Sequence, residues 1–107
     1  MPQIDFSRLT RGEVSSLSGH DRGLAARGLF RLDTLDSQPE PVVITAPANL
    51  DAITPSFVQG MFAKSVHTLG KERFFSHYLF NLPDYLLTDV RLGIQRAMMR
   101  REIAGAA

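Results

Sequence analysis

Apolar and polar residues alternate near the start of the chain in the pattern of a half-buried strand. Over residues 3–9, Ile4 and Phe6 fall on one side and polar residues on the other. After a turn, residues 13–17 carry a weaker strand pattern that predicts a short second strand. We expect this N-terminal strand region, residues 1–17, to lie near an edge of a sheet.

Two later segments are typical of buried strands. Residues 42–46 begin with Val42-Val43-Ile44, a continuous β-branched run that is apolar on both faces and therefore predicts a central strand. A polar, proline-punctuated loop over residues 36–41 precedes it. Residues 73–80 are rich in aromatic side chains and predict a further, largely buried strand.

Between these strands, apolar residues recur at spacings of three and four, which predicts amphipathic helices. The first helix is predicted over residues 20–35, with Ser18 as its N-cap. A glycine on its apolar stripe suggests close approach to a sheet. The stripe comprises Leu24, Ala25, Gly28, Leu29, Leu32 and Leu35, and the arginines expected to point outward or sideways are Arg22, Arg27 and Arg31.

The next helix has clear signals at both ends. Thr54 can cap it, Pro55 suits the first helical position because no amide donor is needed there, and Gly70 suits the residue just past its end. Gln59 and other polar residues lie away from its core stripe. That stripe consists of Val58, Met61, Phe62, Val66 and Leu69.

The last helix has two possible starting points. It begins either near Pro83 or slightly later, with Thr88 as its cap. Residues 102–107 include a glycine and terminal alanines and are expected to fray. The apolar stripe of this helix consists of Val90, Ile94, Ala97 and Met98.

The order of these elements predicts an α/β fold for residues 1–107 as one domain. We expect a small, mainly parallel or mixed sheet of about four strands packed with about three helices. A central 42–46 strand would place the loop 47–56 at the carboxyl end of the sheet, where open α/β sheets bind their ligands.

Composition narrows the function classes. The chain carries 12 Lys and Arg against 11 Asp and Glu, a net charge of +1, which argues against bulk attraction to nucleic acid or membranes. It contains no cysteine, which excludes disulfides and thiolate metal sites and is compatible with a reducing cytosol. No apolar run approaches the ~20 residues of a membrane span. A cytoplasmic protein with no membrane association is therefore expected.

Four segments carry a family resemblance: Ile53-Thr54-Pro55-Ser56-Phe57-Val58, the helix from Met61-Phe62 to Leu69-Gly70, the link Lys71-Glu72-Arg73-Phe74, and Ile94-Gln95-Arg96-Ala97 in the last helix. In this order they resemble the STAS-like domains of unknown function, which are relatives of the STAS domains of anti-sigma factor antagonists. The resemblance covers residues 19–101 and is strongest over 41–98. It implies a single STAS-like layer, without chemistry of its own, that regulates a protein partner in bacterial-type signalling.

The resemblance also implies a partner and a switch. Partners of such domains are often histidine-kinase-like ATPases, and in the antagonists a serine at a helix start is phosphorylated to break the complex. Ser56 falls at that serine, and Thr54 near the acidic residue that usually precedes it. Pro55 replaces a small residue and Phe57 replaces a common glycine. Two interpretations stay open: Thr54 and Ser56 cap the helix, or one of them is a regulated hydroxyl.

The surface around this strand-to-helix junction, residues 49–59, is the predicted contact with a partner. Phe57 is either an outward anchor for a partner or a core residue. A homo-oligomer through an edge strand or the last helix is also compatible with the sequence. The polar residues assigned to the contact are Asn49, Asp51, Thr54, Ser56 and Gln59.

Other chemistry receives weaker support from the sequence. The three histidines, His20, His67 and His77, have no metal-binding spacing, and no residue has a catalytic motif around it, so neither a metal, a cofactor nor an enzyme activity is expected. The alternatives are a small enzyme without a recognisable motif, or an accessory protein that binds nucleic acid through a basic last helix. The basic residues of that helix are Arg91, Arg96, Arg100 and Arg101.

Overall fold

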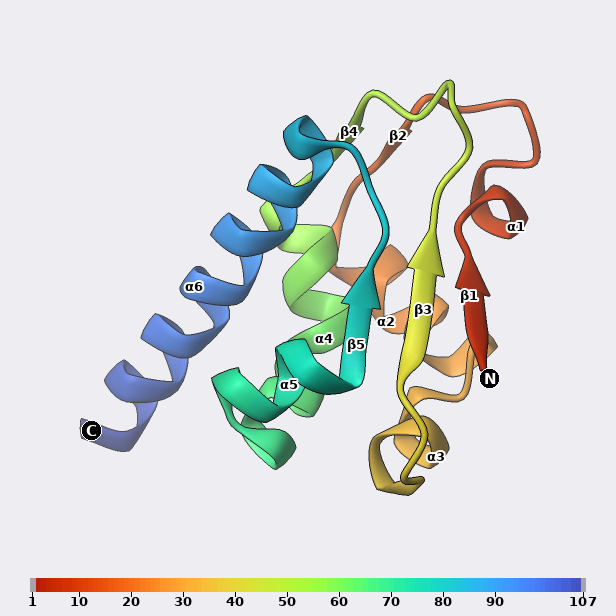
Figure 1. Ribbon diagram of the computed structural model, residues 1–107. Coiled ribbons are helices and arrows are strands. Elements are labelled where there is room, and N and C mark those ends of the chain that lie inside the picture. The colour runs from red at the N-terminus through yellow and green to blue at the C-terminus, as the bar shows by residue number, and fades with distance from the viewer. Residues whose placement is uncertain (1, 107) are drawn as a thin grey trace.

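The computed structural model describes the backbone of residues 2–106 and the side chains of residues 2–99. Its main sheet has three parallel strands in the order β1 (Gln3–Asp5), β3 (Val42–Thr45) and β5 (Tyr78–Phe80) (Figure 1). The predicted central strand is confirmed, since β3 lies between the other two. A second pair of parallel strands, β2 (Ser16–Leu17) and β4 (Ala52–Ile53), lies at the end of the sheet where β3 finishes.

Six helices connect and cover these strands in the described residues. The three longest, α2, α4 and α6, carry the helical layer: α2 and α4 lie behind the sheet and α6 runs beside α4 (Figure 1). The fold is therefore α/β, as predicted, with 3 + 2 strands instead of about four strands in one sheet. The helices are α1 (Ser7–Thr10), α2 (His20–Leu29), α3 (Leu32–Ser37), α4 (Pro55–Leu69), α5 (Lys71–His77) and α6 (Asp84–Ala106).

The sheet is covered on one face. Alternation along each strand buries Ile4, Ile44 and Tyr78 against the helices, while Asp5 and Leu79 on the other face are exposed. Val43 in the middle of that second face is only partly buried. The run that is apolar on both faces thus identified the central strand correctly, but only one of its faces is packed against helices.

The contact between α2 and α4 depends on two glycines. A Cβ atom on Gly23 would lie 2.2 Å from the carbonyl oxygen of Phe57, and one on Gly60 would lie 2.2 Å from the carbonyl oxygen of His20. These distances are shorter than any van der Waals contact, so the two backbones touch at this crossing. The close approach explains why small residues occupy the buried face of α2.

The predicted helix over 20–35 is wrong in its length and in its buried face. It divides at Arg31, whose φ of 55° is left-handed, into α2 and α3. The buried face of α2 carries Gly23, Ala26 and Arg27, whereas Leu24 and Leu29 are 48% and 49% exposed. Contact with α4 selects small residues, so Leu24 and Leu29 of the predicted stripe remain at the surface, whereas Leu32 and Leu35, which fall in α3, are buried and partly buried as predicted. Gly28 is likewise exposed and meets no neighbour.

Three further expectations are corrected. The strand expected over 73–80 is helical as far as His77, because Phe74 and Tyr78, four residues apart, both reach the core. The first strand ends at Asp5, and helix α1 replaces the rest of the predicted strand over 3–9. Gly19 takes the place of Ser18 as the residue before α2.

The predicted limits of the later helices agree with the structure. Helix α4 runs from Pro55 to Leu69, with Thr54 before it and Gly70 after it. Helix α6 begins just after Pro83, the earlier of the two predicted starts. Their predicted stripes are buried or partly buried. The fraying expected over 102–107 lies outside the residues whose side chains are described.

Candidate functional site

At the strand-to-helix junction between β4 and α4, the first turn of α4 is capped by a side chain. Thr54 has extended backbone angles, φ −69° and ψ 151°, and its Oγ1 accepts a hydrogen bond of 3.3 Å from the Phe57 amide. Pro55 follows at the first helical position, where no intrahelical donor is needed. The capping interpretation is therefore confirmed for Thr54.

Ser56 lies on the outer side of this junction. Its side chain is exposed, and its Oγ lies 3.1 Å from Oγ1 of Thr54. The Phe57 amide is capped by Thr54 rather than by Ser56, so the Ser56 hydroxyl is available to solvent at the positive end of the α4 dipole. Chemically, this position can accept a phosphoryl group and stabilise its charge.

The junction is held from two sides. The Ile53 amide donates to Oδ2 of Asp89 in α6 at 3.0 Å, and the Thr54 amide donates to the carbonyl of Leu17 in β2 at 2.8 Å. On the preceding loop, the hydroxyl of Tyr85 in α6 donates to the Leu50 carbonyl at 3.0 Å. These bonds fix the backbone on which Ser56 is presented.

The remaining predicted contact residues divide into surface and core. Asn49 and Asp51 are exposed, and Gln59 is partly exposed, so all three lie at the surface around the junction. Phe57 is 2% exposed, and its ring packs edge-on against Phe6 at 6.4 Å between centroids. Of the two roles considered for Phe57, the core role is the one observed, and this residue is not part of the surface.

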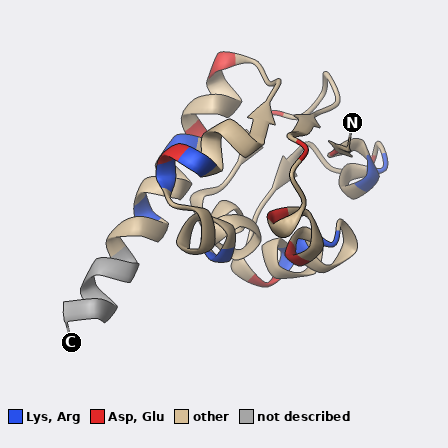
Figure 2. Ribbon diagram, turned by 60° about the horizontal axis from the view of Figure 1, so that its bottom comes forward, with Lys and Arg blue, Asp and Glu red and all other residues tan. Residues whose placement is uncertain are grey.

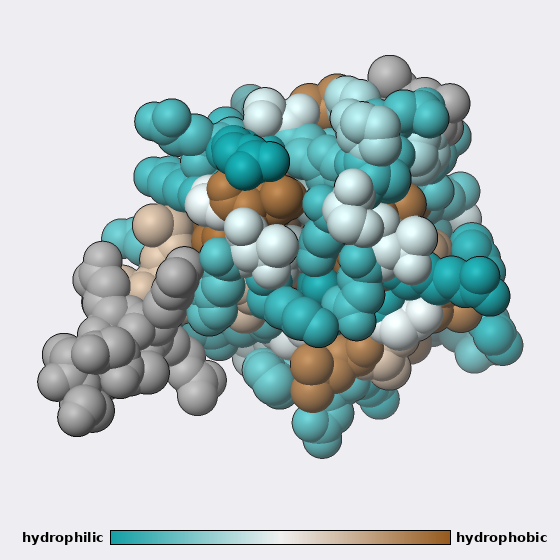
Figure 3. Space-filling view, turned by 90° about the horizontal axis from the view of Figure 1, so that it is seen from below, coloured by the Kyte–Doolittle hydropathy of each residue, from teal (hydrophilic) through white to brown (hydrophobic). Residues whose placement is uncertain are grey.

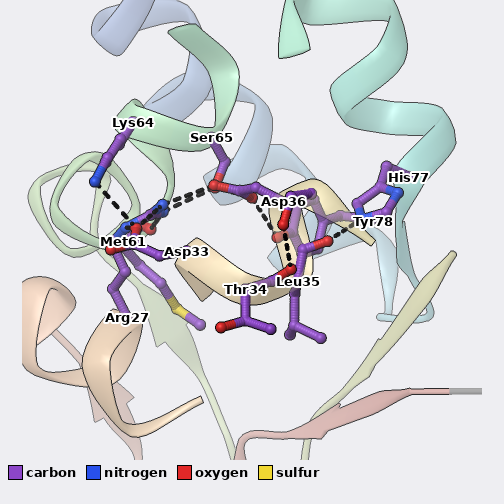
Figure 4. A network of polar contacts seen from close by, with 11 residues as sticks. Arg27, Asp33, Thr34, Leu35, Asp36, Met61, Lys64, Ser65, His77 and Tyr78 are labelled. Carbon is purple, nitrogen blue, oxygen red and sulfur yellow. Dashed lines mark hydrogen bonds and ion pairs between the residues drawn. The ribbon is translucent and has the colours of Figure 1, made fainter. Parts of the chain in front are cut away.

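A second polar cluster, which the sequence did not predict, surrounds Arg27 (Figure 4). The guanidinium of Arg27 is buried rather than outward, and its Nη2 lies 2.7 Å from Oδ1 of Asp33 and 2.7 Å from Oδ2 of Asp36. Its Nη1 donates to the Met61 carbonyl at 3.0 Å and to Oγ of Ser65 at 2.8 Å. One side chain thereby joins α2, α3 and α4.

Asp36 extends this cluster to the sheet. Its Oδ1 accepts hydrogen bonds from Ser65 Oγ at 2.6 Å and from the Tyr78 hydroxyl at 2.5 Å. Burial and the adjacent Asp36 carboxylate raise the pKa of Tyr78 above its ordinary value. Hydrogen bonds from Arg27 and then Lys64 lower the pKa of the exposed Asp33. The polar side chains of the cluster bind one another, so the cluster has a structural role: it joins the helices α2, α3 and α4 to strand β5.

One sequence pattern could have indicated that Arg27 is buried. The residues Gly23, Ala26 and Arg27 fall on one helical face, and two of them are small enough for a helix crossing. Leu24 and Leu29 are more hydrophobic than these residues, so a hydrophobicity pattern predicts that the other face of the helix is buried. An arginine next to small residues, followed by two aspartates six and nine positions later, is the pattern that would have indicated the cluster.

The histidines occupy different elements. His20 begins α2, His67 lies on α4, and His77 ends α5 with its Nε2 2.7 Å from the Leu35 carbonyl oxygen. His77 was predicted to be a strand residue, and it is instead at the helix end next to β5. Within the described residues, no three His, Asp or Glu side chains gather as ligands for a metal ion.

The basic residues predicted on the last helix are distributed along it. Arg91 and Arg96 are exposed on α6, while the side chains of Arg100 and Arg101 lie outside the described residues. Among the residues the structure describes, no helix is long and apolar enough to span a membrane. Comparisons with protein-family models, with curated proteins and with solved structures produced no match to this chain.

Proposed function

We propose that this protein is a cytoplasmic regulatory module that binds a protein partner through the strand-to-helix junction and has no catalytic role of its own. The contact surface consists of Asn49, Asp51, Thr54, Ser56 and Gln59. The resemblance to STAS-like domains supports this proposal and suggests an ATPase of the histidine-kinase-like type, or another regulator, as the partner.

The exposed Ser56 hydroxyl on a fixed backbone is the observation that carries the proposal. A partner can recognise this surface at little conformational cost, because Asp89 and Leu17 already hold the junction in place. Thr54, and not Ser56, accepts the hydrogen bond that caps the helix. The Ser56 side chain is therefore open to modification without loss of the α4 N-terminus.

Phosphorylation of Ser56 would change the charge of this surface. A phosphoryl group adds about −1.5 to −2 charges, and the α4 dipole stabilises such a charge by about 0.3–1 kcal/mol. Asp51 on the same surface is already negative and exposed. The modified surface would repel an acidic partner and block an apolar one, so the partner would be released.

The test compares partner capture by the intact chain and by Ser56→Asp and Ser56→Ala variants in extract of the native host, after crosslinking. We expect the same partner with the wild type and with Ser56→Ala, and at least tenfold lower recovery with Ser56→Asp. Ser76→Asp is the matched control, because Ser76 is an exposed serine on α5. Equal recovery from Ser56→Asp and the wild type would refute the switch.

A second measurement addresses modification directly. Mass spectrometry of the protein purified from its native host, with full coverage of residues 54–60, is expected to find phosphate on Ser56. The capping role of Thr54 Oγ1 makes Ser56 the more accessible of the two hydroxyls. Repeated absence of the modification, under conditions where partner binding varies, would contradict phosphorylation as the regulator.

A further inference from the structure

The outer edge of β5 offers main-chain hydrogen-bonding groups. The Asn81 amide donates to the Ile44 carbonyl of β3 at 2.9 Å. Backbone groups of successive strand residues point to opposite sides, so the Leu79 amide, two positions earlier, also points towards β3. The N–H and C=O of Phe80 between them therefore point away from the sheet. Within the described residues, neither group has a hydrogen-bond partner across that edge, and β5 ends the sheet.

A groove runs along this edge, between β5 and α6. Helix α6 packs mainly on α4, which leaves a hollow of about 560 Å³ beside β5. Its walls include Phe75 from α5, Phe80 from β5, and Leu87 and Val90 from α6. An unpaired strand edge thus opens onto a groove with largely apolar walls.

The groove continues along α5 and α6. A second hollow, of about 630 Å³, shares Phe75 and Arg91 with the first and extends past Ile94 to Met99. Hydrophobic side chains lie among hydrophilic ones beside the grey tail of α6 in Figure 3. The 13 residues from Leu87 to Met99 span about 18 Å of helix, which equals the length of roughly five or six extended residues.

Two cations line this groove. Lys71 of α5 and Arg91 of α6 are both exposed and both line the second hollow, and Figure 2 shows the basic positions of these two helices close to each other. No carboxylate in the described part of the chain forms an ion pair with either of them. A ligand that brings a carboxylate therefore meets unpaired positive charge.

We propose that this groove binds an extended segment of a partner protein, in which acidic and apolar residues alternate, as an additional strand on β5. The segment's backbone would pair with the N–H and C=O of Phe80. Every second side chain would pack on Phe75, Leu87 and Val90, and a carboxylate would lie near Arg91 and Lys71. A second copy fits less well through its own β5, because it would bring the same two cations into the groove.

This surface is separate from the Ser56 junction and shares no residue with it. The experiment selects ligands for the intact chain from a random 12-residue peptide library displayed on phage. We expect enrichment of peptides with Asp or Glu flanked by apolar residues at two-residue spacing. The most enriched peptide is then synthesised with a fluorophore, and its affinity is measured by anisotropy.

Two charge-reversal variants distinguish peptide binding in the groove from general electrostatic attraction of an acidic peptide to α6. Arg91→Glu is expected to weaken binding of the acidic peptide at least tenfold, whereas Arg96→Glu, an exposed arginine of α6 that does not line either hollow, changes it less than twofold. Ser56→Asp is expected to leave peptide affinity unchanged, so this inference and the junction proposal can fail independently. An equal loss of peptide affinity in the two arginine variants would refute binding in the groove.

Hydrogen exchange followed by NMR tests strand addition. Exchange of the Phe80 amide is expected to slow at least tenfold in saturating peptide, while the Leu79 amide, already directed to β3, changes much less. An unchanged Phe80 amide would overturn the proposal, and so would a helical bound peptide. Concentration-dependent self-association that Arg91→Glu abolishes would assign the groove to a second copy and refute a separate partner.

Discussion

Replacing Arg27 by methionine is expected to lower the free energy of unfolding by about 3–5 kcal/mol. Methionine keeps the length and apolar character of the side-chain stem, so the change isolates the guanidinium. Its removal leaves the carboxylate of Asp36 in the protein with only the hydroxyls of Ser65 and Tyr78 as donors. Breaking a buried ion pair in this way typically costs about 3–5 kcal/mol, because one charge stays desolvated.

The two carboxylates contribute unequally to this magnitude. The Asp36 side chain is 6% exposed, so the desolvation argument applies to it in full. The Asp33 side chain is 66% exposed, so water screens its pair with Arg27 and this carboxylate contributes little to the loss. A domain of this size has roughly 5–15 kcal/mol of total stability. The Arg27→Met variant should therefore still fold, but with a small remaining free energy of unfolding.

Urea unfolding followed by circular dichroism measures this loss. With a slope of about 1.5 kcal/mol per molar, the midpoint should fall by roughly 2–3 M. Arg22→Met is the matched control, because Arg22 is exposed on the same helix, and it should change stability by less than about 0.5 kcal/mol. Adding Asp36→Asn to Arg27→Met should restore part of the loss by removing the uncompensated charge.

Two outcomes would refute this reasoning. A loss below about 1 kcal/mol for Arg27→Met would show that Asp36 is not desolvated enough for its charge to matter. A double variant with Asp36→Asn that is no more stable than Arg27→Met alone would place the cost in packing rather than in the unpaired carboxylate.

Two further predictions address the helix crossing and the pH dependence. Gly60→Ala should destabilise the protein by about 1–3 kcal/mol, because its new methyl group would overlap the His20 carbonyl, while Gly28→Ala, where a methyl group meets nothing, should stabilise it by up to about 1 kcal/mol. Thermal unfolding of both variants checks this, and equal shifts would contradict the close crossing. The folded-state pKa of Tyr78 is raised above its unfolded value of 10.0, so its contribution to stability is complete below pH 10 and is lost as the pH rises through the folded pKa. Tyr78→Phe should therefore show a shallower decline of stability above pH 10 than the wild type in urea titrations, and parallel declines would refute the assignment.

The junction was predictable because its signals are local. Thr54, Pro55 and Gly70 act within one turn of the helix ends, where hydrogen bonding depends on neighbours in sequence. The same holds for the start of α6 after Pro83. At Phe57 the sequence left two orientations open, and burial against Phe6 decided between them.

Prediction failed where the deciding contact was distant in sequence. The buried face of α2 is set by Gly60 of α4, 37 positions after Gly23, and a hydrophobicity pattern that covers one helix contains no information about it. The segment over 73–77 has an aromatic pattern compatible with either a strand or a helix. Packing of Phe74 beside Tyr78 selected the helix.

The amino-acid sequence by itself determined the α/β class, the central β3 strand and the capped α4 helix that presents Ser56. The cap depends on hydrogen bonds between neighbours in sequence. The class and the central strand follow from the apolar pattern and order of short segments, although the strands that β3 pairs with lie far away in the sequence. Only the tertiary structure decided the buried Arg27 cluster and the groove beside β5. The cluster joins residues up to 42 positions apart, between Asp36 and Tyr78. The groove exists because α6 packs on α4 and leaves one edge of the sheet uncovered. Long-range packing thus decided which charges are buried and which strand edge is open.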